Sequence, residues 1–163
     1  MRVSDVMNHP AVTCPADAAL DAAARLMWEF DCGMVLAVDD AGRLAGVITD
    51  RDSCLAAYMH RKPLHLIPLA KTMVKPAISV HADDEVLAAE GLMRDNHVRR
   101  LPVIDGAGRP VGLISVDDLA QMAVREHRIG ADRELVETLA AVSRPREAAP
   151  GRPHPLVPTA GRT

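Results

Sequence analysis

Two short segments of the sequence each place a hydroxyl side chain three residues before a carboxylate, a spacing that suits helix capping and ligand binding. They are residues 46–52 (GVITDRD) and residues 112–118 (GLISVDD). The aliphatic residues predict the end of a buried strand, and the hydroxyl and the aspartate predict a capping box that begins a helix. The first N–H groups of such a helix have no intrahelical partner, so the junction can hold an anionic or ribose-bearing ligand. The alternative is that these residues act as helix caps alone.

The elements that must position these segments come from an internal repeat. When the sequence is shifted against itself by about 66 residues, the two halves align without a gap. Met7 then falls on Met73, and Asp52 falls on Asp118. The stretch PAVT at 10–13 falls on PAIS at 76–79. One duplicated unit therefore accounts for most of the chain.

Each unit has the periodicity of a β-α-β-β-α arrangement. We expect strands at 10–14, 34–38 and 44–48 and a closing helix at 50–59, with counterparts at 76–80, 101–104, 111–114 and 116–128. Asp17 is predicted to cap the first helix, which ends near Phe30, and Asp83 or Asp84 its counterpart. Because one unit is too small to bury both faces of its sheet, we predict an α+β fold with two units packed sheet to sheet.

The repeat and the composition divide the chain into five parts. These are a first unit at 1–59, a linker at 60–68, a second unit at 69–128, a further helix at 129–142 and a tail at 143–163. The further helix has an apolar face and is expected to dock on the two units or on a partner. The tail is rich in Pro, Arg, Ala and Gly without periodicity, so we expect it to be disordered.

The composition excludes several classes of function. Trp28, Phe30 and Tyr58 are the only aromatic residues and the net charge is −3, so nucleic-acid binding is not expected. No apolar run reaches transmembrane length and no signal peptide is visible, which indicates a cytoplasmic protein without membrane contact. Because the chain has no nucleophile motif and no metal-ligand spacing, we expect neither an enzyme nor a metal site.

Cysteine and methionine are interpreted as core residues. Cys14, Cys32 and Cys54 form an odd set in the first half of the chain. We expect them to be small buried apolar side chains, with one disulfide as the alternative if two of them lie close together. The methionines are expected to fill the core, because aromatic residues are scarce.

Three motifs in combination resemble the tandem CBS-domain pair, also called a Bateman module. They are M-x-x-P-A-V-T at 7–13, G-V-I-T-D-R-D at 46–52 and R-R-L-P-V-I-D at 99–105, and the resemblance covers about residues 3–125. It implies two units related by a pseudo-two-fold axis, and homodimers of such pairs. Some members of the family bind AMP, ADP, ATP or S-adenosylmethionine in the two clefts between the units. No obligatory cofactor is implied, and the chain is similar to the stand-alone members.

The resemblance also implies which residues bind the adenosine part of a ligand. Asp52 and Asp118 match the carboxylate that accepts hydrogen bonds from the two ribose hydroxyls, a task that suits a pure acceptor. Thr49 and Ser115 match the hydroxyl residue that bonds ribose or phosphate. The backbones of Val12, Thr13, Ile78 and Ser79 match the opening strands, which read the adenine edge.

Arginine suits a phosphate group through its planar guanidinium. Arg99 and Arg100, next to Pro102, lie where the family can bind a phosphate, and Arg51 is a further candidate. The first unit reads CGMVLA at 32–37 where the second reads VRRLPV at 98–103, so it lacks both arginines and the proline. If one cleft alone binds a charged nucleotide, we expect the cleft that contains Arg99 and Arg100. The sequence leaves open which aspartate shares it.

The expected function is therefore a regulatory module that senses adenosine nucleotides. A ligand in a cleft would stabilise one relative orientation of the units and so act on an unidentified target protein. The alternative is a ligand-free scaffold that dimerises and recruits a partner through the 129–142 helix and the basic tail. Nucleic-acid binding through the tail is a third and weaker alternative, because its arginines are sparse, and an enzyme is weaker still.

Overall fold

The computed structural model describes residues 1–126 and 132–143. The first repeat contains η1 (Val3–Asp5), β1 (Thr13–Pro15), α1 (Leu20–Glu29), β2 (Met34–Val38), β3 (Leu44–Thr49) and α2 (Asp50–His60). The second contains η2 (Leu64–Leu66), η3 (Leu69–Lys71), β4 (Val80–His81), α3 (Val86–Asn96), β5 (Arg100–Ile104), β6 (Pro110–Ser115) and α4 (Val116–Glu126). Helix α5 (Asp132–Val142) follows. Apart from Ser143, the predicted tail lies outside the described residues.

Each repeat forms one three-stranded sheet, in the orders β1-β2-β3 and β4-β5-β6. The first strand of each sheet runs parallel to the second, and the second runs antiparallel to the third. A helix makes the parallel connection and a short hairpin makes the antiparallel one, as strand geometry requires. The predicted α+β class with two β-α-β-β-α units is therefore confirmed.

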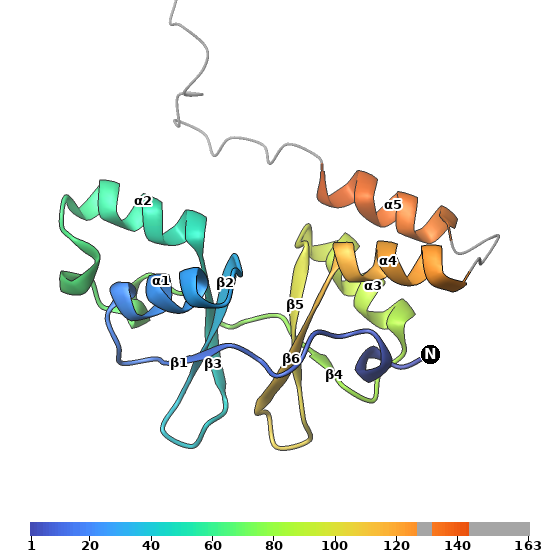
Figure 1. Cartoon of the computed structure of the whole chain (residues 1–163), viewed down its shortest axis with the longest axis horizontal. Coiled ribbons are helices and arrows are strands. Elements are labelled where there is room, and N and C mark those ends of the chain that lie inside the picture. The colour runs from blue at the N-terminus through green and yellow to red at the C-terminus, as the bar shows by residue number, and fades with distance from the viewer. Residues whose placement is uncertain (127–131, 144–163) are drawn as a thin grey trace, which may run out of the picture.

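The two sheets lie at the centre of the molecule, with helices on their outer sides (Figure 1). Val35 and Ala37 of β2 belong to the core under α1 and α2, so Leu36 between them points to the opposite face. Leu36 is nevertheless 1% exposed. Pro102 is likewise buried between Leu101 and Val103, which belong to the core of the second unit. Each unit thus has its own helix-side core, and a further buried layer lies between the sheets.

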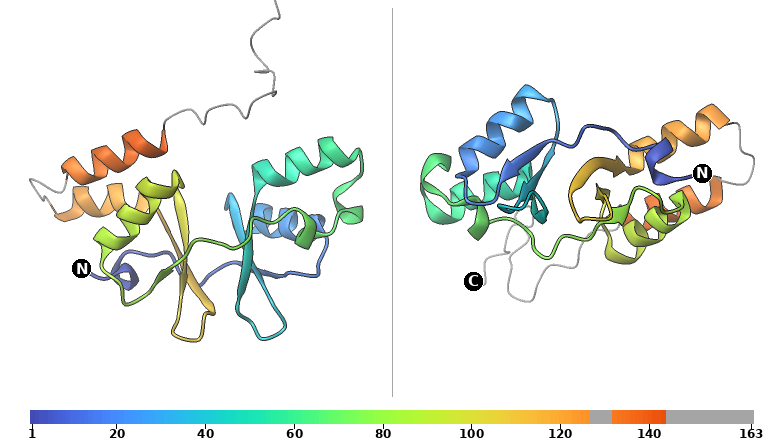
Figure 2. Two further views of the ribbon diagram at one scale, coloured as in Figure 1. Left: turned by 180° about the vertical axis from the view of Figure 1, so that it is seen from behind. Right: turned by 90° about the horizontal axis from the view of Figure 1, so that it is seen from below.

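The segment that opens each repeat packs on the other repeat. Val3 belongs to the core of the second unit, and Ile67 and Leu69 belong to the core of the first. The N–H of Asn8 donates to the Leu113 carbonyl at 2.8 Å, and the Leu113 N–H donates back at 2.9 Å. Figure 2 shows both crossing segments from behind and from below. The open edges of β3 and β6 are therefore covered by chain from the opposite unit.

A glycine at each crossing point allows this close approach. A Cβ on Gly112 would lie 2.7 Å from the Met7 sulfur and 2.8 Å from the Asn8 carbonyl oxygen. At Gly46 the corresponding distances are 2.8 Å to the Met73 sulfur and 2.9 Å to the Val74 oxygen. Since any side chain there would displace the crossing backbone, glycine at these two positions is a packing requirement.

The predicted caps of the helices α1 and α3 are wrong. Helix α1 begins after Ala19 and α3 begins after Glu85, and neither residue accepts a capping hydrogen bond on its side chain. The first helical N–H groups instead donate to the crossing segments, from Leu20 to the Ile67 carbonyl at 3.0 Å and from Val86 to the Met1 carbonyl at 3.2 Å. A tertiary contact therefore replaces the local cap that Asp17 and Asp83 or Asp84 were predicted to supply.

Helix α5 docks on the second unit of its own chain. It packs against α3 and α4, with Leu135 in the core beneath and the Ala141 carbonyl 3.2 Å from the His97 Nδ1. The corresponding outer side of the first unit has no such helix among the described residues (Figure 1). In the described ranges, no helix is both long enough and apolar enough to cross a bilayer.

The aromatic side chains lie at the surface, and the three cysteines range from buried to exposed. Trp28 and Tyr58 are 87% and 81% exposed, so the cores are indeed built from aliphatic residues and methionine. The three cysteines are free thiols. Cys14 is buried as predicted, whereas Cys54 is exposed on α2, so the prediction of burial is wrong for that residue. Burial raises the pKa of the Cys14 thiol.

Candidate functional site

The β3–α2 junction of the first unit is a complete capping box. Asp52 Oδ2 accepts hydrogen bonds from the Thr49 hydroxyl at 2.6 Å and from the Thr49 N–H at 3.1 Å. Thr49 Oγ1 in turn accepts from the Asp52 N–H at 3.2 Å. Asp52 Oδ1 accepts no hydrogen bond from any described residue. The half-buried carboxylate is thus held rigidly by one oxygen while the other remains available.

The β6–α4 junction repeats this geometry but adds one partner. Asp118 Oδ2 accepts from the Ser115 hydroxyl and from the Ser115 N–H, the latter at 2.8 Å. Asp118 Oδ1 accepts from the Asn8 side-chain amide at 2.6 Å. Asn8 lies on the segment that crosses from the first unit, 110 residues away in sequence. Sequence reasoning missed Asn8. The repeat alignment could have drawn attention to it, since a polar residue in the first copy stands where the second copy has the apolar Val74.

One residue of each opening segment lies beside the junction of the other unit. Val74 exchanges backbone hydrogen bonds with Val47 of β3 at 2.8 and 3.1 Å, two residues before the Thr49 that begins the Asp52 junction. Asn8 lies beside the Asp118 junction in the same way, through its bonds with Leu113. Both bridges are antiparallel, so the residues that follow Val74 and Asn8 run toward the hairpin ends of the sheets. We call the two junction regions the Asp52 cleft and the Asp118 cleft, after the clefts that the resemblance implies. Each is built from both units.

The predicted adenine-reading residues differ in the two clefts. The Val12 carbonyl accepts the Leu36 N–H at 3.0 Å, and Thr13 is paired with Leu36 in the sheet. Pro102 takes the place of Leu36 in the second unit and has no N–H to donate. The Ile78 carbonyl accordingly accepts no backbone hydrogen bond from the described residues. The first opening strand therefore uses this carbonyl within its sheet, and the second leaves it available.

Ser79 lines an open hollow of about 420 Å³ between the hairpin of the first unit and the segment 76–79. Asp39, Arg43 and Ala45 line the other side. A hydrogen bond from the Arg43 N–H, with a further one from Ala41, holds the pKa of Asp39 below its usual value. The hollow lies at the hairpin end of β3, whereas Thr49 and Asp52 lie at the helix end. The structure therefore does not bring Ser79 and Asp52 into one pocket.

Arg100 reaches from the second unit into the first. It pairs with Ser115 at the start of β5, and its Nη1 and Nη2 lie 3.7 and 3.8 Å from where a Cβ on Gly33 would stand. Asp50 Oδ2 lies 3.4 Å from the same point. Because the Asp50 N–H faces the Gly33 carbonyl at 3.4 Å, this places the Arg100 guanidinium beside the first turn of α2. Arg100 therefore lies beside the junction that carries Asp52.

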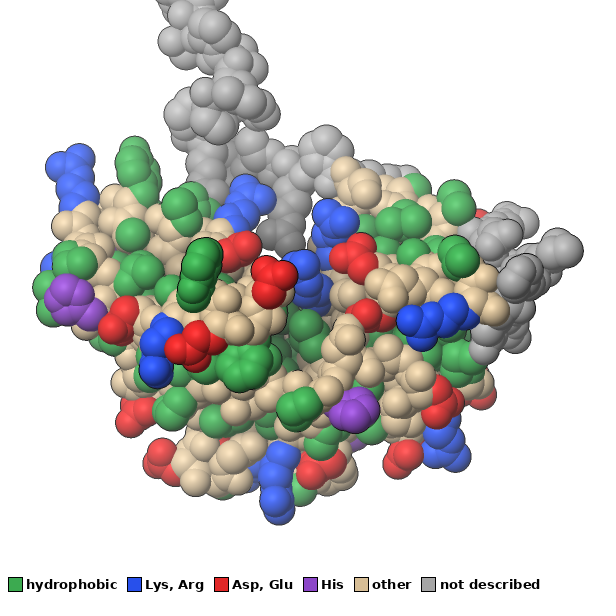
Figure 3. All heavy atoms as spheres, viewed as in Figure 1, with side chains coloured by type: hydrophobic (Ala, Val, Ile, Leu, Met, Phe, Trp, Pro, Cys, Tyr) green, Lys and Arg blue, Asp and Glu red, His purple; other side chains and the backbone are tan. Residues whose placement is uncertain are grey.

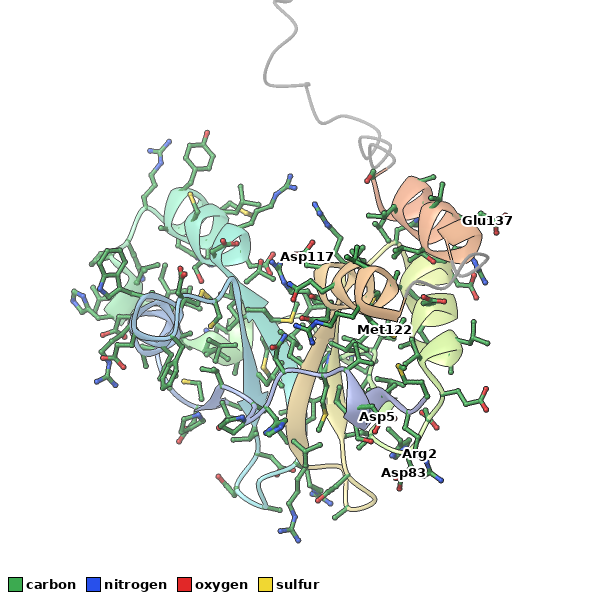
Figure 4. The ribbon with its side chains drawn as sticks, turned by 45° about the vertical axis from the view of Figure 1, so that its right-hand side comes forward. Arg2, Asp5, Asp83, Asp117, Met122 and Glu137 are labelled. Carbon is green, nitrogen blue, oxygen red and sulfur yellow. The ribbon has the colours of Figure 1, made fainter. Side chains whose placement is uncertain are left out.

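The other predicted arginines are more exposed. The Arg99 carbonyl accepts the N–H of Val116 at 3.0 Å, and its side chain is exposed, as is that of Arg51 on α2. Acidic and basic side chains gather where the two units meet on the face in Figure 3. Figure 4 shows Asp117 there, at the start of α4 on the side that faces the first unit. The region can thus bind a ligand that carries both hydrogen-bond donors and an anionic group.

In residues 1–126 and 132–143, no group of three His, Cys, Asp or Glu side chains could hold a metal ion. The junctions combine carboxylate oxygens that the capping boxes hold in place with the nearby guanidinium of Arg100. These groups suit a sugar hydroxyl pair and a phosphate.

A sequence model of the CBS domain matches residues 3–52 and 69–125, which is more than half of the chain. Inosine-5'-monophosphate dehydrogenase of Mycobacterium leprae is 38% identical over 111 residues, which make up 68% of this chain and 20% of that enzyme. The chain therefore spans only a fifth of the length of that curated relative.

Solved structures show the same fold. The CBS domain protein PAE2072 of Pyrobaculum aerophilum, in complex with AMP, superposes with a TM-score of 0.69 at 25% identity, over 83% of this chain and 98% of that one. The conserved CBS domain protein TA0289 of Thermoplasma acidophilum superposes with a TM-score of 0.71 at 23% identity, over 86% of this chain and 75% of that one.

Proposed function

The chain belongs to the CBS domain family, and on that premise we propose that it is a regulatory module. It binds an adenosine nucleotide in a cleft between its two units and catalyses no reaction itself. A cytoplasmic location and an unidentified target protein belong to the same proposal. The AMP complex of PAE2072 supports the choice of an adenosine compound, and AMP, ADP, ATP and S-adenosylmethionine are the candidates.

The observation that carries this proposal is the carboxylate of Asp52. Its Oδ2 is held by Thr49, which fixes the position and orientation of the carboxylate. Its Oδ1 has no donor among the described residues, and a carboxylate can only accept hydrogen bonds. A ribose diol offers two donors, which makes it a suitable partner for this group. Asp118 is held by Ser115 in the same way, but its Oδ1 accepts the Asn8 side-chain amide.

The remaining candidate residues have roles that follow from their places. Backbone groups of Ile78 and Ser79, or of Val12 and Thr13, would contact the base, beside the buried Pro102 in the second unit. Arg100 would bind a phosphate through its planar guanidinium, with Arg99 and Arg51 as exposed helpers.

Regulation would follow from the way both units contribute to each cleft. A ligand that contacts Asp52 of one unit and Arg100 of the other stabilises one relative orientation of the units. A coupling free energy of about 1–3 kcal/mol is typical of such effects, so modest affinity is sufficient. The oriented pair would then present an altered surface to the target protein.

A homodimer is part of the proposal, and the outer side of the first unit supports it. Trp28, Phe30 and Tyr58 lie exposed at the ends of α1 and α2, where aromatic side chains are typical of protein interfaces. Leu55 and Met59 extend this apolar face along α2. Helix α5 covers the equivalent side of the second unit, and no described helix covers this side of the first unit.

Calorimetric titration of the full chain with AMP, ATP and S-adenosylmethionine tests the ligand. We expect binding by at least one of them, and a loss of about ten-fold or more in affinity when both Asp52→Asn and Asp118→Asn are introduced. Asp84→Asn is the matched control, because Asp84 also accepts a backbone N–H, that of His81 at 2.9 Å, away from both clefts. The absence of heat with all three compounds at high micromolar concentration would refute the proposal.

A further inference from the structure

We propose that the two clefts are not equivalent, and that Asn8 closes the Asp118 cleft so that the chain binds one nucleotide, in the Asp52 cleft. This inference rests on the proposed function, and it assigns to Asn8 the role of setting how many ligands bind.

The carboxylates provide the first difference. Asp118 Oδ1, the oxygen that a ribose would need, already accepts the Asn8 amide at 2.6 Å. Asn8 donates its backbone N–H to the Leu113 carbonyl and accepts the Leu113 N–H on its own carbonyl. These two bonds fix Asn8 over the junction, so its side-chain amide is preorganised for the contact with Asp118. A ribose hydroxyl would have to compete with this hydrogen bond for the charged acceptor, and we expect that competition to lower affinity roughly ten- to hundred-fold.

The Asp52 cleft has no such obstacle. Val74 stands at the repeat position of Asn8 and makes the same pair of backbone bonds, to Val47. Its side chain has no hydrogen-bonding group, so Asp52 Oδ1 keeps its acceptor capacity. One polar residue in one copy of the repeat therefore distinguishes the two junctions.

Two further contacts favour the same cleft. The Val12 carbonyl in the Asp118 cleft is taken up by the Leu36 N–H, whereas Pro102 leaves the Ile78 carbonyl free of a backbone donor. Arg100 extends past Gly33 to the first turn of α2, on the Asp52 side. A sugar acceptor and a phosphate partner are thus available together beside Asp52, and the opening segment of the same side keeps an unused carbonyl at Ile78.

The experiment counts AMP molecules per chain by calorimetry in the intact protein, with adenosine as a second probe. We expect one AMP for the wild type, one for Asp118→Asn and none for Asp52→Asn. Asn8→Val, which copies the residue of the other repeat, should add a second site. The double variant Asn8→Val with Asp52→Asn should bind one AMP, whereas Asp52→Asn alone binds none. Adding Asp118→Asn to this double variant should abolish that site. The reverse change, Val74→Asn, should weaken AMP binding at least ten-fold.

The outcomes separate this inference from the proposed function. Binding that survives Asp52→Asn and disappears with Asp118→Asn overturns the assignment of the clefts. Two equal sites in the wild type, or no site in the double variant, overturn the role of Asn8. If neither the wild type nor any variant binds AMP, ATP or S-adenosylmethionine, the proposed function fails, and this inference fails with it. Circular dichroism melting curves confirm that each variant is folded before its stoichiometry is interpreted.

Discussion

Val3 and Leu69 occupy equivalent positions of the repeat, and each is fully buried in the core of the opposite unit. The two units have therefore exchanged their opening segments. Arg2 strengthens the exchange on one side, since its Nη1 lies 3.0 Å from Asp83 Oδ1 in the second unit (Figure 4). If the two units were separated at the linker, each would consequently lose a core residue, because Val3 belongs to the chain of the first unit and Leu69 to that of the second.

The exchange predicts that a substitution at Val3 or Leu69 destabilises the opposite unit, whose core contains that side chain. Leu69→Ala should lower the free energy of unfolding by about 2–5 kcal/mol. Because Leu69 packs under α1, amide hydrogen exchange measured by mass spectrometry should accelerate first in β1–β3. Val3→Ala should accelerate exchange first in β4–β6. Leu66→Ala, at a position 57% exposed, is the control and should have little effect.

Arg100 predicts a dependence of affinity on the phosphate group. Arg100→Ala should weaken AMP binding by roughly ten- to hundred-fold, because it removes a charge-assisted hydrogen bond near α2. Adenosine, which lacks the phosphate, should bind the variant and the wild type alike. Arg109→Ala on the second hairpin is the matched control. Equal losses for AMP and adenosine would mean that Arg100 shapes the cleft and does not bind phosphate.

The hairpin carboxylates predict a loss of stability in acid. The pKa of Asp39 is lowered by the hydrogen bond from the Arg43 N–H, and that of Asp105 by the bond from the Arg109 N–H. Because the folded pKa lies below the unfolded one, their contribution is present above about pH 4 and is lost as the pH falls through the folded pKa. The melting temperature of Asp39→Ala should therefore lie below that of the wild type at pH 7, with a difference that shrinks in acid. Asp40→Ala, whose carboxylate makes no hydrogen bond with a described residue, should show no such pH dependence.

The exposed face of α2 predicts a substitution that separates the dimer. Tyr58→Glu places a charge where a second copy would bury an aromatic ring, and light scattering after size exclusion should show a shift from dimer to monomer. Leu87→Glu introduces the same charge on α3 at a position 55% exposed and is the control. A wild type that is already monomeric at micromolar concentration would contradict the homodimer.

Local patterns predicted most of the secondary structure and one part of the site. Strand β2 has the bounds that the apolar run at 34–38 indicated. The hydroxyl and aspartate spacing predicted both capping boxes, because all the groups involved lie within four residues of each other. The predicted caps at Asp17 and at Asp83 or Asp84 failed because crossing backbone satisfies those helix ends, which no local pattern records.

The sequence by itself determined that the chain is a duplication, that each copy is β-α-β-β-α, and that an aspartate is fixed at the end of each third strand. These features depend on contacts between residues close in the chain. Only the tertiary structure decided which opening segment lies beside which aspartate, that Asn8 donates a hydrogen bond to Asp118, and that Arg100 lies beside the first turn of α2. The reason is that both open sheet edges are covered by chain from the opposite copy, and two nearly identical copies leave that pairing undetermined until they pack.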